Sequence, residues 1–407
     1  MRPLRRTPVP PGAAGVRALI GPVTAALAGT GPAVAPVPTT TVTVSNEYVA
    51  RILSAIRPDD PDAPLESDGV AVVLSTSGST GAPRGVLLTA SALTSLSSAV
   101  NGHGTGPTWV AALPLTSMGG FNVLIRALAA GHEPIALASI GGAEPFTPSD
   151  FARAVHEASA TSSDVRVSLV AAQVRRLMTD EAGIEALRAC SQVLVGAGPL
   201  PASVDDAARA AGVVLTRTYG ATETSGGCVY DGLPLTGVGI GFASPAPAEV
   251  LVTGPMLAAG YRCEPALTAE RFTPDGYRTG DLGALDAHGR LSLLGRLDDV
   301  VVVNGVNVSL GAVERVVEGC DGVDACVIIA APEPEGEVEL IAFVVAAQPS
   351  SGLRASIAER VQDALGRAAL PRRVAHMSEF PLLPNRKVDR AALRALAAAQ
   401  EQVTWLR

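Results

Sequence analysis

One stretch of sequence, VAVVLSTSGSTGAPRGV at residues 70–86, constrains the fold more than any other part of the chain. Residues 70–74 are apolar and mostly β-branched, which predicts a buried strand. The strand runs into a loop of glycines and hydroxyl residues, which can turn several N–H and O–H donors toward one point. Arg84 adds a guanidinium group suited to phosphate oxygens. We expect a helix from about residue 89 to residue 100, with Thr89 as its N-cap. This order of strand, loop and helix predicts a phosphate site, whose loop residues are Ser75, Thr76, Ser77, Gly78, Ser79, Thr80 and Gly81.

The spacing of this loop is not that of a Walker loop, because Gly81 is followed by Ala-Pro-Arg-Gly and not by Lys-Ser or Lys-Thr. A flexible Ser/Gly linker is the alternative interpretation, but a linker would not lie between a buried strand and a capped helix. The stretch resembles the phosphate loop of the adenylate-forming superfamily, which includes acyl-CoA ligases, adenylation domains and luciferases. Arg84 stands where relatives usually have Lys, so the charge is kept and only the geometry of the contact should change.

Bulk properties narrow the class of protein further. A chain of 407 residues predicts two or three domains, and 47% hydrophobic residues suit a substantial core. A net charge of −8 argues against a nucleic-acid-binding surface. The five cysteines include no C-x-x-C pair, which fits a reducing cytoplasm better than a disulfide framework or a zinc site. Prolines and glycines after the basic N-terminus argue against a signal peptide, and no apolar run predicts membrane insertion.

The predicted elements divide the chain into a large α/β part and a small α+β part. Residues 1–65 look like a lead-in with helices at 13–27 and 46–56. From residue 70 to about 221, strands alternate with helices, and glycine and hydroxyl turns follow the strands, where α/β sheets bind ligands. Short strands and turns from about residue 249 predict a β-rich subdomain. We place the domain boundary at 297/298, with an N-terminal domain over residues 1–297 and a C-terminal domain over residues 298–407.

Two strand ends carry further candidate nucleotide contacts. Thr222 and Glu223 follow a strand that includes Tyr219 and Gly220, and together they offer an aromatic face, a hydroxyl and a carboxylate. Without other context this segment would be an ordinary turn. By resemblance to the superfamily, Thr222 would contact phosphate, Glu223 would hold Mg²⁺ and Tyr219 would flank adenine. The turn Gly196, Ala197 and Gly198 resembles the adenine-side loop of the family, although a plain glycine turn is nearly as good an interpretation.

The segment YRTGD at 277–281 and the segment GRLDD at 295–299 resemble two further family motifs. The resemblance implies that Asp281 binds the ribose hydroxyls and that Arg296 reaches the ribose or phosphate. It also implies that Asp298 is the hinge about which the C-terminal domain swings. The alternatives are a turn-capping Asp281 and a solvated charge run at 296–299.

The C-terminal part carries two more family positions. The tract PNRKVD at 384–389 resembles the final motif of the superfamily, so Lys387 would bridge the acyl carboxylate and the α-phosphate while charge shifts between them. A lone lysine would otherwise be a solvated surface residue. Gly305 matches the glycine that lines the tunnel for the CoA thiol, and a larger side chain there should block pantetheine but not ATP.

A narrower likeness concerns the acid. The segments GGCVYDG at 226–232 and SLVAAQ at 168–173 resemble those of actinobacterial o-succinylbenzoate–CoA ligases of menaquinone biosynthesis. The resemblance places a bulky aromatic acid near Ser117, Gly119, Ser168 and Gly226. Thr116 and Ser117 stand where those enzymes usually carry a histidine or an aromatic–histidine pair that lines the acyl pocket. The small polar pair leaves either a wider or differently bonded pocket or a tolerated change at its edge.

The resemblance therefore implies a ligase that joins a carboxylic acid to CoA through an acyl-AMP, with ATP, Mg²⁺ and CoA as cofactors and substrates. The acid would be 2-succinylbenzoate, and a homodimer is left open. The alternatives are a CoA ligase for another aryl or aliphatic acid and a non-catalytic nucleotide-binding protein. The second alternative needs a broken motif, and the Lys, Glu and Asp positions are all intact.

Overall fold

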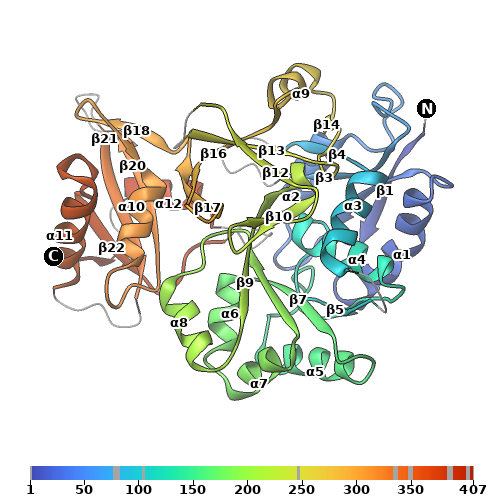
Figure 1. The fold of residues 1–407 in the computed structure, drawn as a ribbon, viewed down its shortest axis with the longest axis horizontal. Helices are drawn as coiled ribbons and strands as arrows, with labels where there is room; N and C mark the ends of the chain where they lie inside the picture. The colour runs from blue at the N-terminus through green and yellow to red at the C-terminus, as the bar shows by residue number, and fades with distance from the viewer. Residues whose placement is uncertain are drawn as a thin grey trace. The chain divides into compact units, whose positions relative to one another are not determined.

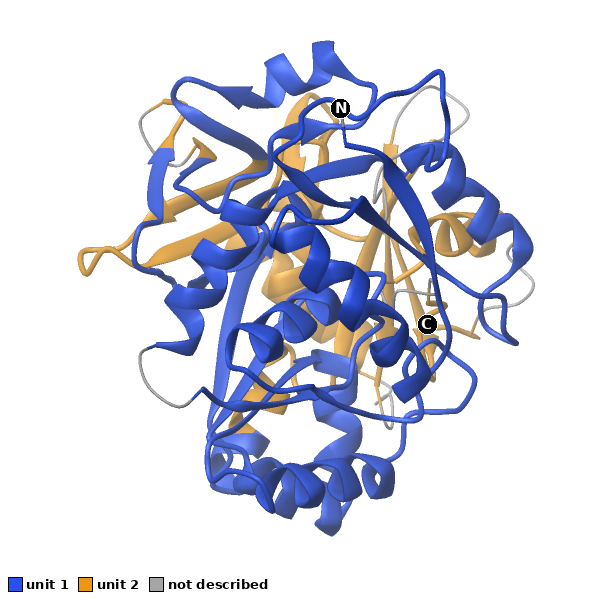
Figure 2. Cartoon of the chain, turned by 90° about the vertical axis from the view of Figure 1, so that its right-hand side faces the viewer, with its two compact units in different colours: residues 1–200, 207–241, 251–279 blue, residues 201–206, 242–250, 280–407 orange. Residues whose placement is uncertain are grey.

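The computed structural model describes residues 2–76, 83–102, 106–244, 248–332, 338–346, 352–382, 388–399 and 404–406. The chain divides into two compact units (Figure 2). Unit 1 comprises residues 1–200, 207–241 and 251–279, and unit 2 comprises residues 201–206, 242–250 and 280–407. The elements in which the chain passes between units are α8 (Ala202–Ala210), β12 (Gly239–Phe242), β13 (Ala248–Thr253) and β16 (Gly276–Leu285). The domain boundary at 297/298 stays a prediction.

A five-stranded sheet in unit 1 carries the predicted phosphate loop. Its strands run in the order β1 (Leu4–Val9), β2 (Ala33–Pro38), β3 (Val70–Ser75), β4 (Gly85–Thr89) and β14 (Gly260–Tyr261). The first three strands are parallel, and β4 and β14 are antiparallel to their neighbours. Helices α1 (Ala13–Leu27) and α2 (Asn46–Ile56) have the predicted bounds. The prediction that residues 1–65 form a lead-in is wrong, because β1 and β2 extend the sheet.

A seven-stranded sheet forms the other half of unit 1. Its order is β11 (Leu233–Pro234), β10 (Gly226–Tyr230), β9 (Leu215–Ala221), β8 (Gln192–Gly196), β7 (Val165–Val170), β5 (Thr108–Ala111) and β6 (Ile135–Ala136). The run from β9 to β6 is parallel. Parallel strands place their carboxyl ends at one edge of the sheet, where ligands bind in open α/β sheets.

Helices lie between and outside the two sheets of unit 1 (Figure 1). Helices α1 and α3 (Ala90–Asn101) contact the five-stranded sheet and also α4 (Met118–Ala129), which packs on the seven-stranded sheet. Other helices of this unit are α5 (Pro148–Ser159), α6 (Ala171–Leu177), α7 (Glu181–Ala189) and α9 (Pro265–Arg271). Helix α2 buries Val49, Ile52 and Ile56 against the sheet, a spacing that gives a helix one apolar face. The predicted α/β architecture of the large part is confirmed.

Unit 2 is built around a four-stranded sheet. Its order is β20 (Ala325–Pro332), β21 (Val338–Val345), β22 (Arg373–Met377) and β23 (Thr404–Trp405). Alternate residues of β20 and β21 face two different cores, as the two-residue period of a strand requires. One core contains α10 (Leu310–Glu318) and α11 (Leu353–Leu365), and the other contains α12 (Arg390–Ala399). The predicted α+β architecture is confirmed.

Two hairpins complete unit 2. The second half of β16 pairs with β17 (Leu291–Arg296), and β18 (Val300–Val303) pairs with β19 (Val306–Ser309) around Asn304 and Gly305, as predicted. The remaining short strand is β15 (Phe272–Thr273) of unit 1. Among the described residues, no helix has the length and apolarity needed to cross a bilayer.

Candidate active site

The predicted phosphate loop connects the two strands of an antiparallel hairpin, β3 and β4. Ser75 at the end of β3 lies opposite Gly85 at the start of β4. The Thr76 N–H donates to the Arg84 carbonyl at 2.7 Å, and the Arg84 N–H donates to the Thr76 hydroxyl at 3.2 Å. The prediction that the loop leads directly into a helix is therefore wrong, because β4 lies between them. Thr89 does cap α3, as predicted, by accepting from the Ala92 N–H. The sequence reasoning missed β4 because its apolar run, 86–88, is only three residues long.

Part of the predicted loop can be placed on this hairpin and part cannot. Ser75, Thr76 and Arg84 frame its base. Arg84 Nε lies 3.7 Å from Glu264 Oε2, and both side chains are largely exposed. The predicted loop residues Ser77, Gly78, Ser79, Thr80 and Gly81 lie outside the described residues.

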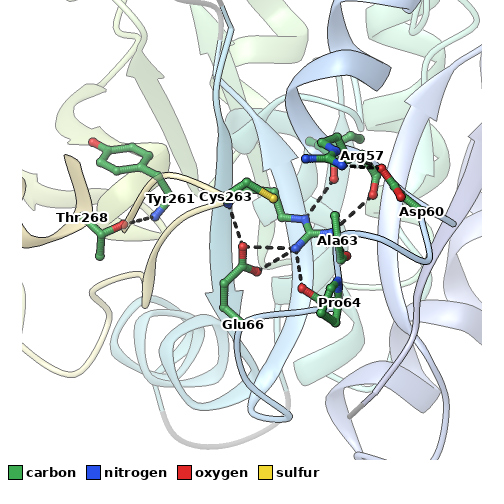
Figure 3. Close-up of polar contacts among 10 residues, drawn as sticks. Arg57, Asp60, Ala63, Pro64, Glu66, Tyr261, Cys263 and Thr268 are labelled. Atoms are coloured by element: carbon green, nitrogen blue, oxygen red, sulfur yellow. Dashed lines mark hydrogen bonds and ion pairs between the residues drawn. The ribbon is translucent and has the colours of Figure 1, made fainter. Parts of the chain in front are cut away.

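A buried arginine that sequence reasoning missed holds the base of this hairpin (Figure 3). The Arg262 N–H donates to the Gly85 carbonyl at 2.8 Å, and a Cβ on Gly85 would lie 2.8 Å from the Cβ of Arg262. The guanidinium donates to Glu66 at 3.0 Å and to the Pro64 carbonyl at 2.8 Å, and it also reaches the Ala63 carbonyl. Because a buried guanidinium needs all these acceptors, it fixes the end of β14 against residues 63–66. The backbone N–H of Arg262 then joins this region to Gly85, at the end of the predicted phosphate loop. No local motif in the sequence signals this long-range arrangement.

Glu223 is buried, and tyrosine side chains lie close to it. It lies in the short 3₁₀ turn Thr222–Thr224 that follows β9, and Tyr261 donates its hydroxyl to Glu223 Oε1 at 3.0 Å. Burial first, and then the negative charge of Glu223, raise the pKa of Tyr261 and of Tyr277. Tyr219 also lies close enough to contribute to the raised pKa of Tyr277. Tyr261 and Tyr277 therefore stay protonated, and Tyr261 remains a donor to the carboxylate.

The surroundings of Glu223 suit one carboxylate ligand of Mg²⁺. Among the residues that the structure describes, no group of three or more His, Cys, Asp and Glu side chains is placed to hold a metal ion. Mg²⁺ commonly takes one or two carboxylates from a protein and completes its shell with phosphate oxygens and water. A single buried carboxylate held by a hydroxyl donor fits that pattern.

The start of α4 meets the turn after Glu223. Asn122 donates from Nδ2 to the Ser225 carbonyl at 2.7 Å, and Ser225 donates from Oγ to the Met256 carbonyl at 2.7 Å. Gly226 has a φ of +111°, and a Cβ there would lie only 1.9 Å from Asn122 Nδ2. Only glycine fits both the backbone angle and the close approach. The contact brings Gly226 beside the first turn of α4, which contains Gly119.

Other predicted acyl and adenine residues lie at the same carboxyl edge of the seven-stranded sheet. Ser168 is buried near the end of β7, and Ser117 precedes α4 with its hydroxyl donating to the Pro114 carbonyl at 2.8 Å. Gln173 joins two strand ends by accepting from the Val170 N–H and donating to the Ala112 carbonyl. The adenine-side candidates that follow or end β8 and β9 are Gly196, Ala197, Gly198, Tyr219 and Gly220. Ala197 has a φ of +66° although it is not glycine, which marks a tight turn.

Unit 2 brings three predicted residues into one ion-pair network. Arg296 Nη1 lies 2.9 Å from Asp281 Oδ1, and Arg296 Nε lies 2.8 Å from Asp298 Oδ1. Burial lowers the pKa of Arg296, but the hydrogen bond and charge of Asp298 and the charge of Asp281 outweigh burial and raise it. The predicted ribose ligand and the predicted hinge residue therefore share one guanidinium.

The hairpin turn of β18 and β19 borders a hollow of about 410 Å³ within unit 2. The residues that line it are Val303, Asn304, Val338, Leu340, Arg367, Ala368, Leu370 and Arg372. Gly305 has a φ of +79°, and a Cβ there would meet no described atom within 4 Å. A hollow lined by apolar side chains and two arginines can accept an uncharged ring system that carries phosphate. Lys387 lies outside the described residues.

Comparison with known proteins gives a consistent result. The chain matches the family model described as AMP-binding enzyme over residues 13–261 and the model described as AMP-binding enzyme C-terminal domain over residues 312–387. It is 37% identical over 341 residues to a probable 2-succinylbenzoate–CoA ligase of Mycobacterium tuberculosis, covering 82% of this chain and 87% of that protein. It is 30% identical over 371 residues to novobiocin biosynthesis protein H of Streptomyces niveus, covering 82% of this chain and 58% of that protein.

Solved structures agree on the fold. The amide bond synthetase McbA of Marinactinospora thermotolerans matches with a TM-score of 0.73 at 25% identity, covering 97% of this chain and 90% of that one. The o-succinylbenzoate CoA synthetase of Bacillus subtilis in complex with its acyl-adenylate matches with a TM-score of 0.70 at 20% identity, covering 96% and 88%. On these matches, the chain belongs to the AMP-binding, adenylate-forming enzyme family and includes that family's C-terminal domain.

Proposed function

We propose that the protein is an ATP- and Mg²⁺-dependent acid–CoA ligase that converts 2-succinylbenzoate to its CoA thioester in menaquinone biosynthesis. The observation that carries the proposal is the 37% identity, over most of both chains, to a relative described as a 2-succinylbenzoate–CoA ligase. The gathering of Ser117, Gly119, Ser168 and Gly226 around one edge of the sheet supports an acyl pocket there.

In the first half-reaction, a carboxylate oxygen of the acid attacks the α-phosphorus of ATP, and the bond from that phosphorus to the bridging oxygen breaks. Acyl-AMP forms and pyrophosphate leaves with the electron pair. The loop from Ser75 to Arg84 would hold the β- and γ-phosphates through N–H, O–H and guanidinium donors. Thr222 would donate to an α-phosphate oxygen. Glu223 would serve as one carboxylate ligand of Mg²⁺, whose positive charge would balance the charge of the leaving pyrophosphate.

Other residues would orient the nucleotide and stabilise developing charge. Tyr219 and the turn Gly196–Gly198 would flank adenine, and Asp281 would accept from the ribose hydroxyls. Arg296 already pairs with Asp281, so it would hold that carboxylate in place or reach the phosphate itself. Lys387 would lie between the acyl carboxylate and the α-phosphate, where negative charge moves in the transition state.

In the second half-reaction, the CoA thiolate attacks the acyl carbon and AMP leaves as its phosphate takes the electron pair. We propose that the C-terminal domain rotates about Asp298, so that Lys387 leaves the site and Gly305 lines the thiol's path. The open space beside Gly305 and the two arginines of the adjacent hollow support a role for this face in holding CoA. One site would thus serve two reactions in turn.

The proposal predicts that AMP and pyrophosphate form only when an acid is supplied. Incubation of the protein with ATP, Mg²⁺, CoA and a panel of acids measures this directly. We expect AMP and a CoA thioester with 2-succinylbenzoate, and little AMP with acetate or benzoate. Acid-independent AMP formation, or none with any acid, would reject the ligase.

A second candidate is a ligase for another aryl or aliphatic acid. It is favoured by Thr116 and Ser117, whose small polar side chains stand where o-succinylbenzoate ligases usually carry a histidine or an aromatic–histidine pair. The same panel separates the two, since the preferred acid is the one with the highest kcat/KM.

We also propose a cytoplasmic location, because the five cysteines are all unpaired, as in a reducing compartment. A homodimer is proposed only as an assembly to be tested by sedimentation.

A further inference from the structure

The start of α12 is fastened to the outer edge of β20 by a half-buried ion pair. Arg390, the first residue of α12, donates from Nη2 to Glu314 Oε1 at 2.7 Å and from Nη1 to the Ile328 carbonyl at 3.1 Å. Glu314 Oε1 also accepts from the Ile328 N–H at 2.9 Å. Arg390 and Glu314 therefore bind both backbone polar groups of the same residue.

These side chains take the place of a neighbouring strand at the outer edge of β20. β20 is at the edge of its sheet, and the N–H and carbonyl of Ile328 point away from β21 and need partners. Glu314 and Glu318, one turn apart on α10, accept from the N–H groups of Ile328 and Cys326. Because the pair is half-buried, breaking it would leave a partly desolvated charge and a backbone group without these partners.

The described residues on either side of positions 383–387 contact one another. Leu382 and Val388 form an antiparallel bridge, and the Asp389 N–H donates to the Pro381 carbonyl at 2.8 Å. Asp389 Oδ1 then accepts from the N–H groups of Ala391 and Ala392 at 3.0 Å, which caps α12. Val388 is therefore held by its bridge on one side and by the anchored helix start on the other.

We infer that Arg390 and Glu314 are positioning residues for the adenylation half-reaction, because they fix the start of α12, which begins three positions after Lys387 in the sequence. The inference depends on the proposed function of Lys387, which is the chain neighbour of Val388. Arg390 acts through the backbone at 388–390 and contacts no reacting atom. A misplacement of about 1 Å can reduce a rate by roughly 100-fold. Loss of the Arg390–Glu314 ion pair should therefore lower the rate of adenylation as well as the stability of the protein.

The chain offers a matched control at the other end of the same helix. Arg373 pairs with Glu339, lies 4.8 Å from the Trp405 ring centre, and donates from Nη1 to the Ala397 carbonyl near the end of α12. Arg373→Met removes a guanidinium that is about as buried as that of Arg390. Its contact with α12 is at Ala397, at the end of the helix that is farther from Lys387 in the sequence.

The test compares Arg390→Met and Arg373→Met in the full-length protein through the two half-reactions. Acid-dependent ATP–pyrophosphate exchange reports adenylation, and thioester formation from preformed acyl-AMP and CoA reports the second step. We expect Arg390→Met to lose roughly 10- to 100-fold in exchange and less than about twofold in thioester formation. Arg373→Met should change both steps by about the same small factor. Arg390→Lys should recover part of the exchange, and Glu314→Gln should lower exchange while its amide oxygen still accepts from Ile328.

Equal losses of both steps in Arg390→Met, or a loss confined to exchange in Arg373→Met as well, would overturn the inference. So would unchanged exchange in Arg390→Met. Failure of the proposed function looks different, because the unmodified protein would then show no acid-dependent exchange at all.

Discussion

Arg296 lies between Asp281 and Asp298, with its Nη1 2.9 Å from Asp281 Oδ1 and its Nε 2.8 Å from Asp298 Oδ1. The predicted ribose ligand and the predicted hinge are therefore held by one side chain. We expect Arg296→Met to raise the KM for ATP about tenfold, because Asp281 loses the cation that orients it. An ATP titration of pyrophosphate exchange measures this. An unchanged KM with a lowered melting temperature would mean that the network is only structural.

The ion pair of Arg84 and Glu264 leads to a second prediction. The atoms are 3.7 Å apart and both side chains are largely exposed, so the pair contributes less than about 1 kcal/mol to stability. Under the proposed function, a nucleotide phosphate would compete with Glu264 for Arg84. Glu264→Gln should therefore lower the KM for ATP about two- to threefold with no change in melting temperature. A higher KM would show that Glu264 helps to place Arg84.

The hydroxyl of Tyr261 is expected to position Glu223 for Mg²⁺. Tyr261→Phe removes the 3.0 Å hydrogen bond and leaves a buried carboxylate without this donor, at a cost of about 1–3 kcal/mol. We predict that half-maximal exchange will need several-fold more Mg²⁺ and that calorimetry will show weaker MgATP binding. Binding and Mg²⁺ dependence like those of the unmodified protein would exclude a positioning role.

Glu318 should make unit 2 sensitive to pH. Burial raises the pKa of Glu318 to about 7, with the nearby Glu314 also raising it. In the unfolded chain the pKa would be near its ordinary value of about 4.3. The folded state thus binds more protons than the unfolded state between these values, and stability falls as pH rises from about 4.5 to 7.

Glu318→Gln removes this charge while keeping an acceptor for the Cys326 N–H. We expect the variant to match the unmodified protein near pH 4 and to exceed its stability by roughly 1–3 kcal/mol at pH 8. Thermal melts of the two proteins across this range measure the difference. A difference that stays constant with pH would contradict the shifted pKa.

The sequence predicted the elements whose signals are local. Helices α1 and α2 have the expected bounds, and the turn Asn304–Gly305 is the hairpin turn that its dipeptide favours. The glycine and hydroxyl turns were expected at strand ends, and Ser168, Gly196 and Glu223 lie at or just beyond them.

Other features could not be read from local patterns. β1 carries two arginines and a proline, and β2 carries two prolines, which usually argue against a strand inside a sheet. Arg262 and Tyr261 are remote in sequence from Glu66 and Glu223, so nothing near either partner signals the contact. Such pairs are set by tertiary packing and are invisible to periodicity and motif.

The measurement that tests the account most directly uses Lys387→Ala. With 2-succinylbenzoate, the unmodified protein should catalyse acid-dependent ATP–pyrophosphate exchange and should also make the thioester from preformed acyl-AMP. We predict that Lys387→Ala loses the exchange by at least about 100-fold and keeps thioester formation. If exchange survives in Lys387→Ala, or if both half-reactions are lost together, the assignment of Lys387 to adenylation is wrong.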